Sequence, residues 1–221
     1  MSLALLHSRS LDGLDAPEVT VEVHLANGLP SFTLVGLADT EVKEARERVR
    51  AALQTSGLDF PSNKRITVNL APADLPKESG RFDLPIALGI LAASGQIDAT
   101  KLDAFEFVGE LGLAGDLRAM RGALAMAVAL RRRGATRALV MPQASAGEAA
   151  RVEGLAILGA AHLLDVVKSL LPGDAAMPLA RAVALPAEPA PPGPDLRDVK
   201  GQSAAKRALE VAAAGGHSVF M

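Results

Sequence analysis

The 221-residue sequence contains no cysteine, no tryptophan and no tyrosine, and each absence removes a class of chemistry. Without cysteine there is no disulfide bond, zinc–thiolate site or cysteine nucleophile, and a cytoplasmic location is expected. With only six Phe as aromatic residues, the sequence offers little for stacking the bases of single-stranded nucleic acid. The net charge of −2 is not that of a typical nucleic-acid-binding protein, so any DNA contact is expected to be electrostatic, through local basic patches.

Long apolar segments are also missing. No run of apolar residues approaches the roughly 18 residues of a transmembrane helix, and polar residues come too early in the N-terminal segment for a signal peptide. Apolar residues make up 49% of the chain and charged residues 22%, which is typical of a globular protein. We therefore expect no membrane partner and a core that closes without covalent crosslinks.

Strand and helix patterns alternate over the first 170 or so residues. Residues 16–25 alternate apolar and polar side chains as a half-buried strand does, Asn27-Gly28 predicts a turn, and residues 32–35 are expected to form the paired strand. A helix is expected over residues 39–57, with Asp39 as its N-cap. The other expected elements are strands at 66–70, 105–111, 115–120, 137–141 and 155–158, and helices at 83–94, 122–133, 145–152 and 162–171. This alternation predicts an α/β domain of the α+β type.

The composition divides the chain into three parts. Residues 1–172 are expected to form the α/β domain. Residues 173–194 are rich in Pro and Ala, which indicates a semi-rigid linker. Residues 195–221 begin a further module, with a helix over 202–214 and a strand from about residue 217.

We searched the sequence for a nucleophile and for metal ligands. Lys77 and Ser79 lie two residues apart in a proline-rich loop, and a Ser/Lys pair can carry out acyl transfer if burial lowers the pKa of the lysine. A solvated lysine is the simpler interpretation and is favoured. The four histidines lie far apart and show no metal-ligand spacing. No catalytic residue and no metal site is predicted.

Basic residues gather in the helix at 39–57 and in the segments that follow it. The simpler interpretation of this helix is a solvated face with acidic and basic residues paired at i, i+3 and i, i+4. The alternative is a helix that presents arginines to phosphates or to a neighbouring subunit. The candidate DNA contacts are Lys43, Arg46, Arg50, Lys64, Arg65, Lys77 and Arg81.

Three segments resemble one family, the ComM/YifB proteins, which are magnesium chelatase-like AAA+ ATPases. They are Gly36–Arg50 (GLADTEVKEARERVR), Ile66–Ala87 (ITVNLAPADLPKESGRFDLPIA) and the stretch from Val108 to Gly115 (VGELGLAG) with the helix that follows it. Residues 109–118 and 137–142 are also similar to the proteolytic domain of Lon protease and to the Lon-like domain of RadA. These resemblances imply a Lon-protease-like, ribosomal protein S5 domain 2-like fold, in which helices back a mixed sheet.

The similarity to Lon also implies where catalytic residues would stand. The catalytic serine of Lon precedes the helix that corresponds to residues 83–94, and residues 80–83 contain no serine. The catalytic lysine corresponds to Ala123 or Leu124. The resemblance therefore implies a domain without peptidase activity.

The segment Asp195–Leu209 resembles the start of the AAA+ module in the same family. Val199, Gly201 and Gln202 would border the adenine of ATP in an intact protein. The 221 residues contain no G-x-x-x-x-G-K-[ST] phosphate-binding pattern. The resemblance thus implies ATP and Mg²⁺ for the full-length protein and no cofactor for this chain.

The resemblance implies ATP-driven DNA branch migration during natural transformation and recombination, with hexameric rings as the working form. This chain would be a non-catalytic N-terminal domain that assists ring assembly or guides DNA. The alternative is a chaperone-like adaptor domain that binds protein substrates of an AAA+ ATPase. An active Ser/Lys peptidase ranks far behind both.

Overall fold

The computed structural model describes residues 2–13, 15–36, 40–75, 77, 80–134, 136–186, 193 and 195–220, with the backbone alone at residues 40–43. The chain divides into two units, Met1–Leu185 and Pro186–Met221. The predicted N-cap Asp39, the serine at position 79, the side chain of Lys43 and most prolines of the predicted linker lie outside the described residues.

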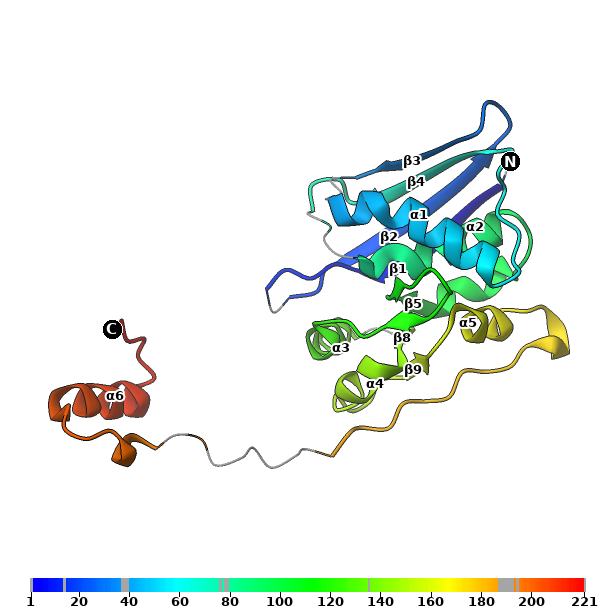
Figure 1. The fold of residues 1–221 in the computed structure, drawn as a ribbon. Helices are drawn as coiled ribbons and strands as arrows, with labels where there is room; N and C mark the ends of the chain where they lie inside the picture. The colour runs from blue at the N-terminus through cyan, green and yellow to red at the C-terminus, as the bar shows by residue number, and fades with distance from the viewer. Residues whose placement is uncertain are drawn as a thin grey trace. The chain divides into compact units, whose positions relative to one another are not determined.

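The first unit is built on a seven-stranded mixed sheet (Figure 1). β1 pairs antiparallel with β2 and parallel with β5, and β5, β8 and β9 continue the sheet in parallel. On the other side, β4 is antiparallel to β2 and parallel to β3. The sheet confirms the predicted α/β class. In order across the sheet, the strands are β3 (Ser31–Val35), β4 (Arg65–Ala71), β2 (Glu18–Ala26), β1 (Ser2–Arg9), β5 (Phe105–Phe107), β8 (Ala138–Pro142) and β9 (Ile157–Ala160), and a separate two-stranded ribbon consists of β6 (Glu110–Leu111) and β7 (Leu117–Arg118).

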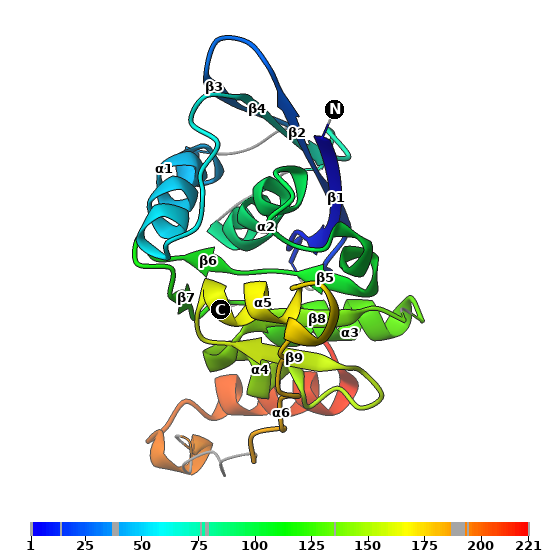
Figure 2. The same cartoon turned by 90° about the vertical axis from the view of Figure 1, so that its right-hand side faces the viewer.

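Helices pack on the sheet in two clusters (Figure 2). Alternate residues of β8 point to opposite faces, so Val140 joins the cluster that contains α1, α2 and α5, while Leu139 and Met141 join the cluster of α3 and α4. Gly89 lets α2 approach β2 closely, because a Cβ there would lie 2.4 Å from Cγ2 of Val23. The helices of this unit are α1 (Thr40–Thr55), α2 (Asp83–Ala93), α3 (Ala123–Arg132), α4 (Gln143–Ala149) and α5 (Leu163–Ser169), with 3₁₀ turns η1 (Gly80–Phe82), η2 (Ala99–Ala104) and η3 (Gly173–Ala175).

Two features of the sheet differ from the sequence-based expectation. The prediction that residues 32–35 pair with the strand at 16–25 is wrong, because β4 lies between β2 and β3 and pairs with both. The N-terminal strand β1 was not predicted, although it is the central strand of the sheet. Its buried positions, Ala4 and Leu6, alternate with the exposed Leu3 and Leu5, so the usual contrast between apolar and polar faces is absent.

The first unit includes residues 173–185, which the sequence analysis assigned to the linker. The amide of Ala182 donates to the carbonyl of Ile157 at 2.8 Å, and the amide of Gly159 donates to the carbonyl of Ala180 at 3.3 Å. β9 is the last strand of the sheet, so it has free backbone groups that this segment can satisfy. Leu185 contacts α4, where its amide donates to the carbonyl of Gly147.

The second unit contains the 3₁₀ turn η4 (Leu196–Asp198) and the helix α6 (Ser203–Gly215). The helix was predicted, but residues 217–220 form no strand, contrary to expectation. A strand needs a partner for its backbone groups, and the described part of this unit contains no other strand. Among the described helices of the whole chain, none combines the length and the apolar character that crossing a bilayer requires.

Candidate functional site

Two of the predicted basic residues, Arg46 and Arg50, lie on the exposed side of α1. They are four residues apart, so they share one face of the helix. A stripe of buried apolar residues on a neighbouring face anchors the helix and fixes the direction in which the arginines point. The stripe consists of Ala45, Val49, Ala52 and Leu53.

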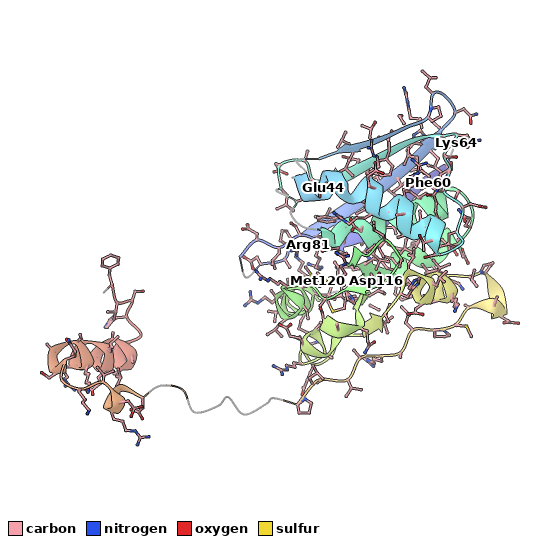
Figure 3. The ribbon with its side chains drawn as sticks, viewed as in Figure 1. Glu44, Phe60, Lys64, Arg81, Asp116 and Met120 are labelled. Atoms are coloured by element: carbon pink, nitrogen blue, oxygen red, sulfur yellow. The ribbon has the colours of Figure 1, made fainter. Side chains whose placement is uncertain are left out.

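A third basic residue, Lys64, reaches the same place from the loop before β4. The amide of Lys64 donates to the carbonyl of Pro61 at 3.1 Å, which closes a turn, and its Nζ donates to Oδ1 of Asn27 at 2.7 Å. Phe60 comes just before this turn, and the side chain of Gln96 fixes the backbone next to it through two hydrogen bonds, at 3.0 and 2.9 Å, with Asp59. Figure 3 shows Phe60 and Lys64 close together where β4 begins, well separated from Arg81.

Arg46, Arg50 and Lys64 line one open hollow of about 290 Å³, which we call the basic pocket. It lies between α1, the start of β3 and the turn before β4. Beside the three cations, one carboxylate, Glu47, lines the pocket, so positive charge is in excess. The remaining lining is apolar or carries hydroxyl groups: Pro30, Ser31, Phe32, Phe60, Pro61, Ser62 and Ile66.

The charged groups of the basic pocket remain available to a ligand. Arg46 contacts Glu47 at 2.7 Å, but both side chains are more than half exposed, and such a surface ion pair is weak. The guanidinium of Arg50 lies over the ring of Phe60, with 5.6 Å between Cζ and the ring centroid. This cation–π contact holds the arginine in place without neutralising its charge.

The other predicted DNA contacts lie elsewhere. Arg65 is exposed, one residue beyond Lys64, and does not line the pocket. Lys77 is buried and donates to the carbonyl of Pro72, and burial lowers the pKa of its ammonium group, partly offset by Asp74. Arg81 is only 8% exposed, in η1.

Arg48 lies on the same helix as Arg46 and Arg50 but has a different environment. Its Nε donates to Oδ2 of Asp83 at 2.6 Å and its Nη2 to Oδ1 at 3.0 Å, which joins α1 to α2. Oδ2 of Asp83 also accepts the amide of Leu111 at 3.2 Å. Burial raises the pKa of the Asp83 carboxyl to about 6, against the opposing effect of Arg48. This pair helps to position α1, and therefore the arginines of the basic pocket.

The residues at the positions that correspond to Lon's catalytic residues are packed in the core, partly exposed or ion-paired. Ala123, at the start of α3, is fully buried, while Leu124 is 38% exposed. Asp83 is engaged with Arg48, as described above. Of the predicted Ser/Lys pair only Lys77 lies within the described residues. Within the described residues, no three His, Cys, Asp or Glu side chains gather to hold a metal ion.

In the second unit, the residues expected beside adenine form an exposed turn before α6. Val199 is 45% exposed, and its carbonyl accepts a hydrogen bond from Nζ of Lys206. Gly201 and Gln202 both adopt positive φ, at 73° and 53°. A positive φ is uncommon for a residue other than glycine, so the backbone of Gln202 has an unusual conformation in this turn.

Sequence comparisons define the class of the chain. The family described as subunit ChlI of Mg-chelatase matches residues 21–145, and the family described as magnesium chelatase, subunit ChlI, matches residues 195–221. The first match covers most of β2, the strands β3, β4, β5 and β8, the helices α1 to α3 and the basic pocket, so the chain has a magnesium chelatase-like domain.

The relatives narrow this class further. The chain is 50% identical over 223 residues to the competence protein ComM of Haemophilus influenzae, 49% identical over 223 residues to YifB of Salmonella typhimurium and 47% identical over 221 residues to YifB of Escherichia coli. Each alignment covers all of this chain but only 42 to 43% of the relative. The chain belongs to the ComM/YifB family of magnesium chelatase-like proteins.

Proposed function

We propose that this chain is the non-catalytic N-terminal part of a ring-forming AAA+ ATPase that moves DNA branches, and that its first unit guides DNA through the basic pocket. Family membership supports the ATPase context, and one relative is named a competence protein, which agrees with a role in DNA uptake and recombination. We place the protein in the cytoplasm, with hexamers as the working form.

The lack of peptidase chemistry is part of this proposal. The position that corresponds to Lon's lysine carries an alanine, fully buried, or a leucine, neither of which can move a proton. Asp83 and Arg48 satisfy each other near the position of Lon's serine. These residues hold helices together, which fits a scaffold better than a hydrolase.

ATP and Mg²⁺ belong to the full-length protein in this proposal. Within this chain, the exposed apolar side chain of Val199 and the amide of Gln202 fit a base-contacting role, with Gly201 allowing close approach. No residue pattern in the chain fits the phosphates, and the hydrolysis of bound ATP would supply the free energy for DNA movement elsewhere in the ring.

One observation carries the DNA-guiding role: three cations from two separate segments, α1 and the turn before β4, line one pocket with a single carboxylate among them. Lysine and arginine contacts to phosphates release counterions and provide most of the non-specific affinity for DNA. Such binding needs no overall positive charge, so the net charge of −2 does not oppose it.

The test is charge reversal of the pocket in the 221-residue chain, as Arg46→Glu/Arg50→Glu/Lys64→Glu. We expect salt-sensitive DNA binding to be lost, with the salt slope falling by roughly 0.7 to 0.9 for each phosphate contact removed. The matched control is Arg131→Glu/Arg132→Glu/Arg133→Glu, which changes the same charge among exposed arginines at the end of α3.

The same two triple variants in the full-length protein complete the test. The pocket variant is expected to lower the rate of ATP-driven branch migration, and the control is not. If the chain shows no salt-sensitive DNA binding and branch migration survives the pocket variant, the DNA-guiding role is wrong and a role in ring assembly remains. Binding to unfolded protein, with no effect of DNA on ATPase rate, would instead favour the adaptor function.

A further inference from the structure

We infer that the basic pocket takes a nucleotide of single-stranded DNA, with its base against the Arg50–Phe60 pair and its phosphates on Lys64. The inference rests on the proposed function and specifies its substrate: an unpaired strand rather than a double helix. It assigns a role to Phe60, which the sequence analysis did not single out.

The size of the pocket favours a unit as small as one nucleotide. Its volume of about 290 Å³ is just below the range of pockets that hold drug-sized molecules, about 300 to 1,000 Å³. The three cations line this hollow instead of being spread over a broad surface. A stiff double helix can reach only its rim, whereas a flexible single strand can place a base and a phosphate inside.

The lining of the pocket provides for both halves of a nucleotide. The guanidinium of Arg50 lies over the aromatic ring of Phe60. Groups of both kinds can stack on nucleic-acid bases without distinguishing one base from another. The apolar side chains of Phe32 and Ile66 extend this part of the lining. Lys64 and the hydroxyl of Ser62 provide donors for a phosphate.

A second hollow shows where the strand continues. It has a volume of about 550 Å³ and shares Lys64 and Pro61 with the basic pocket. Its lining includes hydroxyl, imidazole and amide groups, which can contact a sugar or a phosphate. These groups belong to Ser2, His24, Asn27 and Ser94.

The position of Lys64 between the two hollows is what favours a strand over a free nucleotide. The phosphate that links two nucleotides lies between their bases and sugars, and Lys64 lines both hollows at once. Its hydrogen bond to Asn27 leaves an ammonium group with two further donors. The path therefore accommodates at least two consecutive nucleotides.

The experiment measures affinity of the 221-residue chain by fluorescence anisotropy at fixed salt, for a 15-nucleotide oligothymidine, a 15-base-pair duplex and thymidine monophosphate as competitor. We expect the single strand to bind at least ~10-fold more tightly than the duplex. Thymidine monophosphate is expected to displace the strand only at concentrations far above those of unlabelled oligothymidine.

Three substitutions test the residues. Phe60→Leu keeps apolar volume but removes the ring, and is expected to weaken single-strand binding about tenfold, within the range found for base–aromatic stacking. Arg50→Lys keeps the charge but removes the planar group, and is expected to weaken it several-fold. Lys64→Gln is compared with Arg65→Gln, which removes the same charge one residue away, outside the pocket; only the first is expected to reduce affinity.

Each outcome has a defined meaning. Thermal unfolding of every variant shows whether Phe60→Leu still folds, and Arg50→Lys carries the test if it does not. The inference would be overturned if the duplex binds as tightly as the single strand or more tightly, or if the free nucleotide displaces the strand as readily as unlabelled strand does. It would also be overturned if Phe60→Leu and Arg50→Lys both leave the affinity unchanged, or if Lys64→Gln and Arg65→Gln have equal effects. Loss of duplex binding in the triple charge reversal would still support the proposed function. Absence of all DNA binding by the chain would overturn the inference, and the DNA-guiding role would fall with it only if branch migration also survives the triple charge reversal.

Discussion

The arginines of this protein occur in two contrasting environments, buried ion pairs and the open basic pocket. Arg9 and Glu106 are each 1% exposed and form two hydrogen bonds, at 2.6 and 2.9 Å, that tie β1 to β5. Arg46 and Arg50 are exposed on α1, where Arg46 contacts a surface carboxylate and Arg50 an aromatic ring. The same residue type therefore serves the structure in one region and is available to a ligand in the other.

Arg48 shows that this difference is decided by position around a helix. It lies two residues from both Arg46 and Arg50, and a two-residue step turns the side chain to another face. There it meets Asp83 of α2 and becomes mostly buried, with 18% of its side chain exposed. Buried pairs are thus expected to control stability, and pocket residues to control binding, with little overlap between the two.

The largest effect is expected from breaking the pair between β1 and β5. Arg9→Met leaves the carboxylate of Glu106 buried without its partner, which is expected to lower the free energy of unfolding by about 3 to 5 kcal/mol. The carbonyl of Ala16 also loses its donor. Urea denaturation measures the change, and Arg9→Met/Glu106→Met is the control: if the double variant is as unstable as the single one, the charge is not the cause.

Removing the link between α1 and α2 is expected to have a smaller effect. Arg48→Ala should lower the free energy of unfolding by about 2 to 3 kcal/mol, because Asp83 stays buried but can take up a proton at its raised pKa. The same denaturation measurement applies, with Arg46→Ala as a matched arginine on the same helix. If both substitutions lowered the free energy of unfolding equally, the contrast between the buried Arg48 and the exposed Arg46 would be wrong.

The raised pKa of Asp83 predicts a pH dependence. The folded protein binds this proton more tightly than the unfolded chain, so the contribution of Asp83 to stability is fully present below about pH 4 and is lost as the pH rises to about 6. The change is expected to be roughly 2 kcal/mol. The difference in unfolding free energy between the natural chain and Asp83→Asn, followed from pH 4 to 7, should show this slope; a flat difference would show that the carboxyl does not titrate there.

The smallest effect on stability is expected in the basic pocket itself. Arg46→Ala and Lys64→Ala should each change the free energy of unfolding by less than about 0.5 kcal/mol, because the ion pair of Arg46 and the hydrogen bond from Lys64 to Asn27 are both exposed to solvent. Both are expected to weaken DNA binding at low salt. Calorimetric unfolding measures the stability of each variant and a titration measures its DNA binding. A marked loss of stability would mean that these residues support the fold.

Much of the fold could be read from local patterns. The helices α1 to α3 and the strands β2, β4 and β8 were predicted because their apolar residues recur at helical or strand spacing. The pairing of β3 was not predicted, because strand pairing depends on residues that are distant in sequence. The strand β1 was not predicted either, because it has apolar residues on both faces. Within the pocket, the cations were found among seven candidates, whereas Phe60 gave no signal, since a single phenylalanine in a loop has no periodicity.

What the sequence alone determined is the class of the protein and the set of its candidate cations. Composition, spacing and family motifs are local or linear properties, so they can be read without a structure. Tertiary structure alone decided which cations gather in the basic pocket and which are buried. Lys64 lines the pocket with Arg46 and Arg50 because the turn before β4 lies beside α1. Lys77 and Arg81, by contrast, are buried. Burial and proximity arise only when distant segments pack, and these two properties determine whether a charge supports the fold or contacts a ligand.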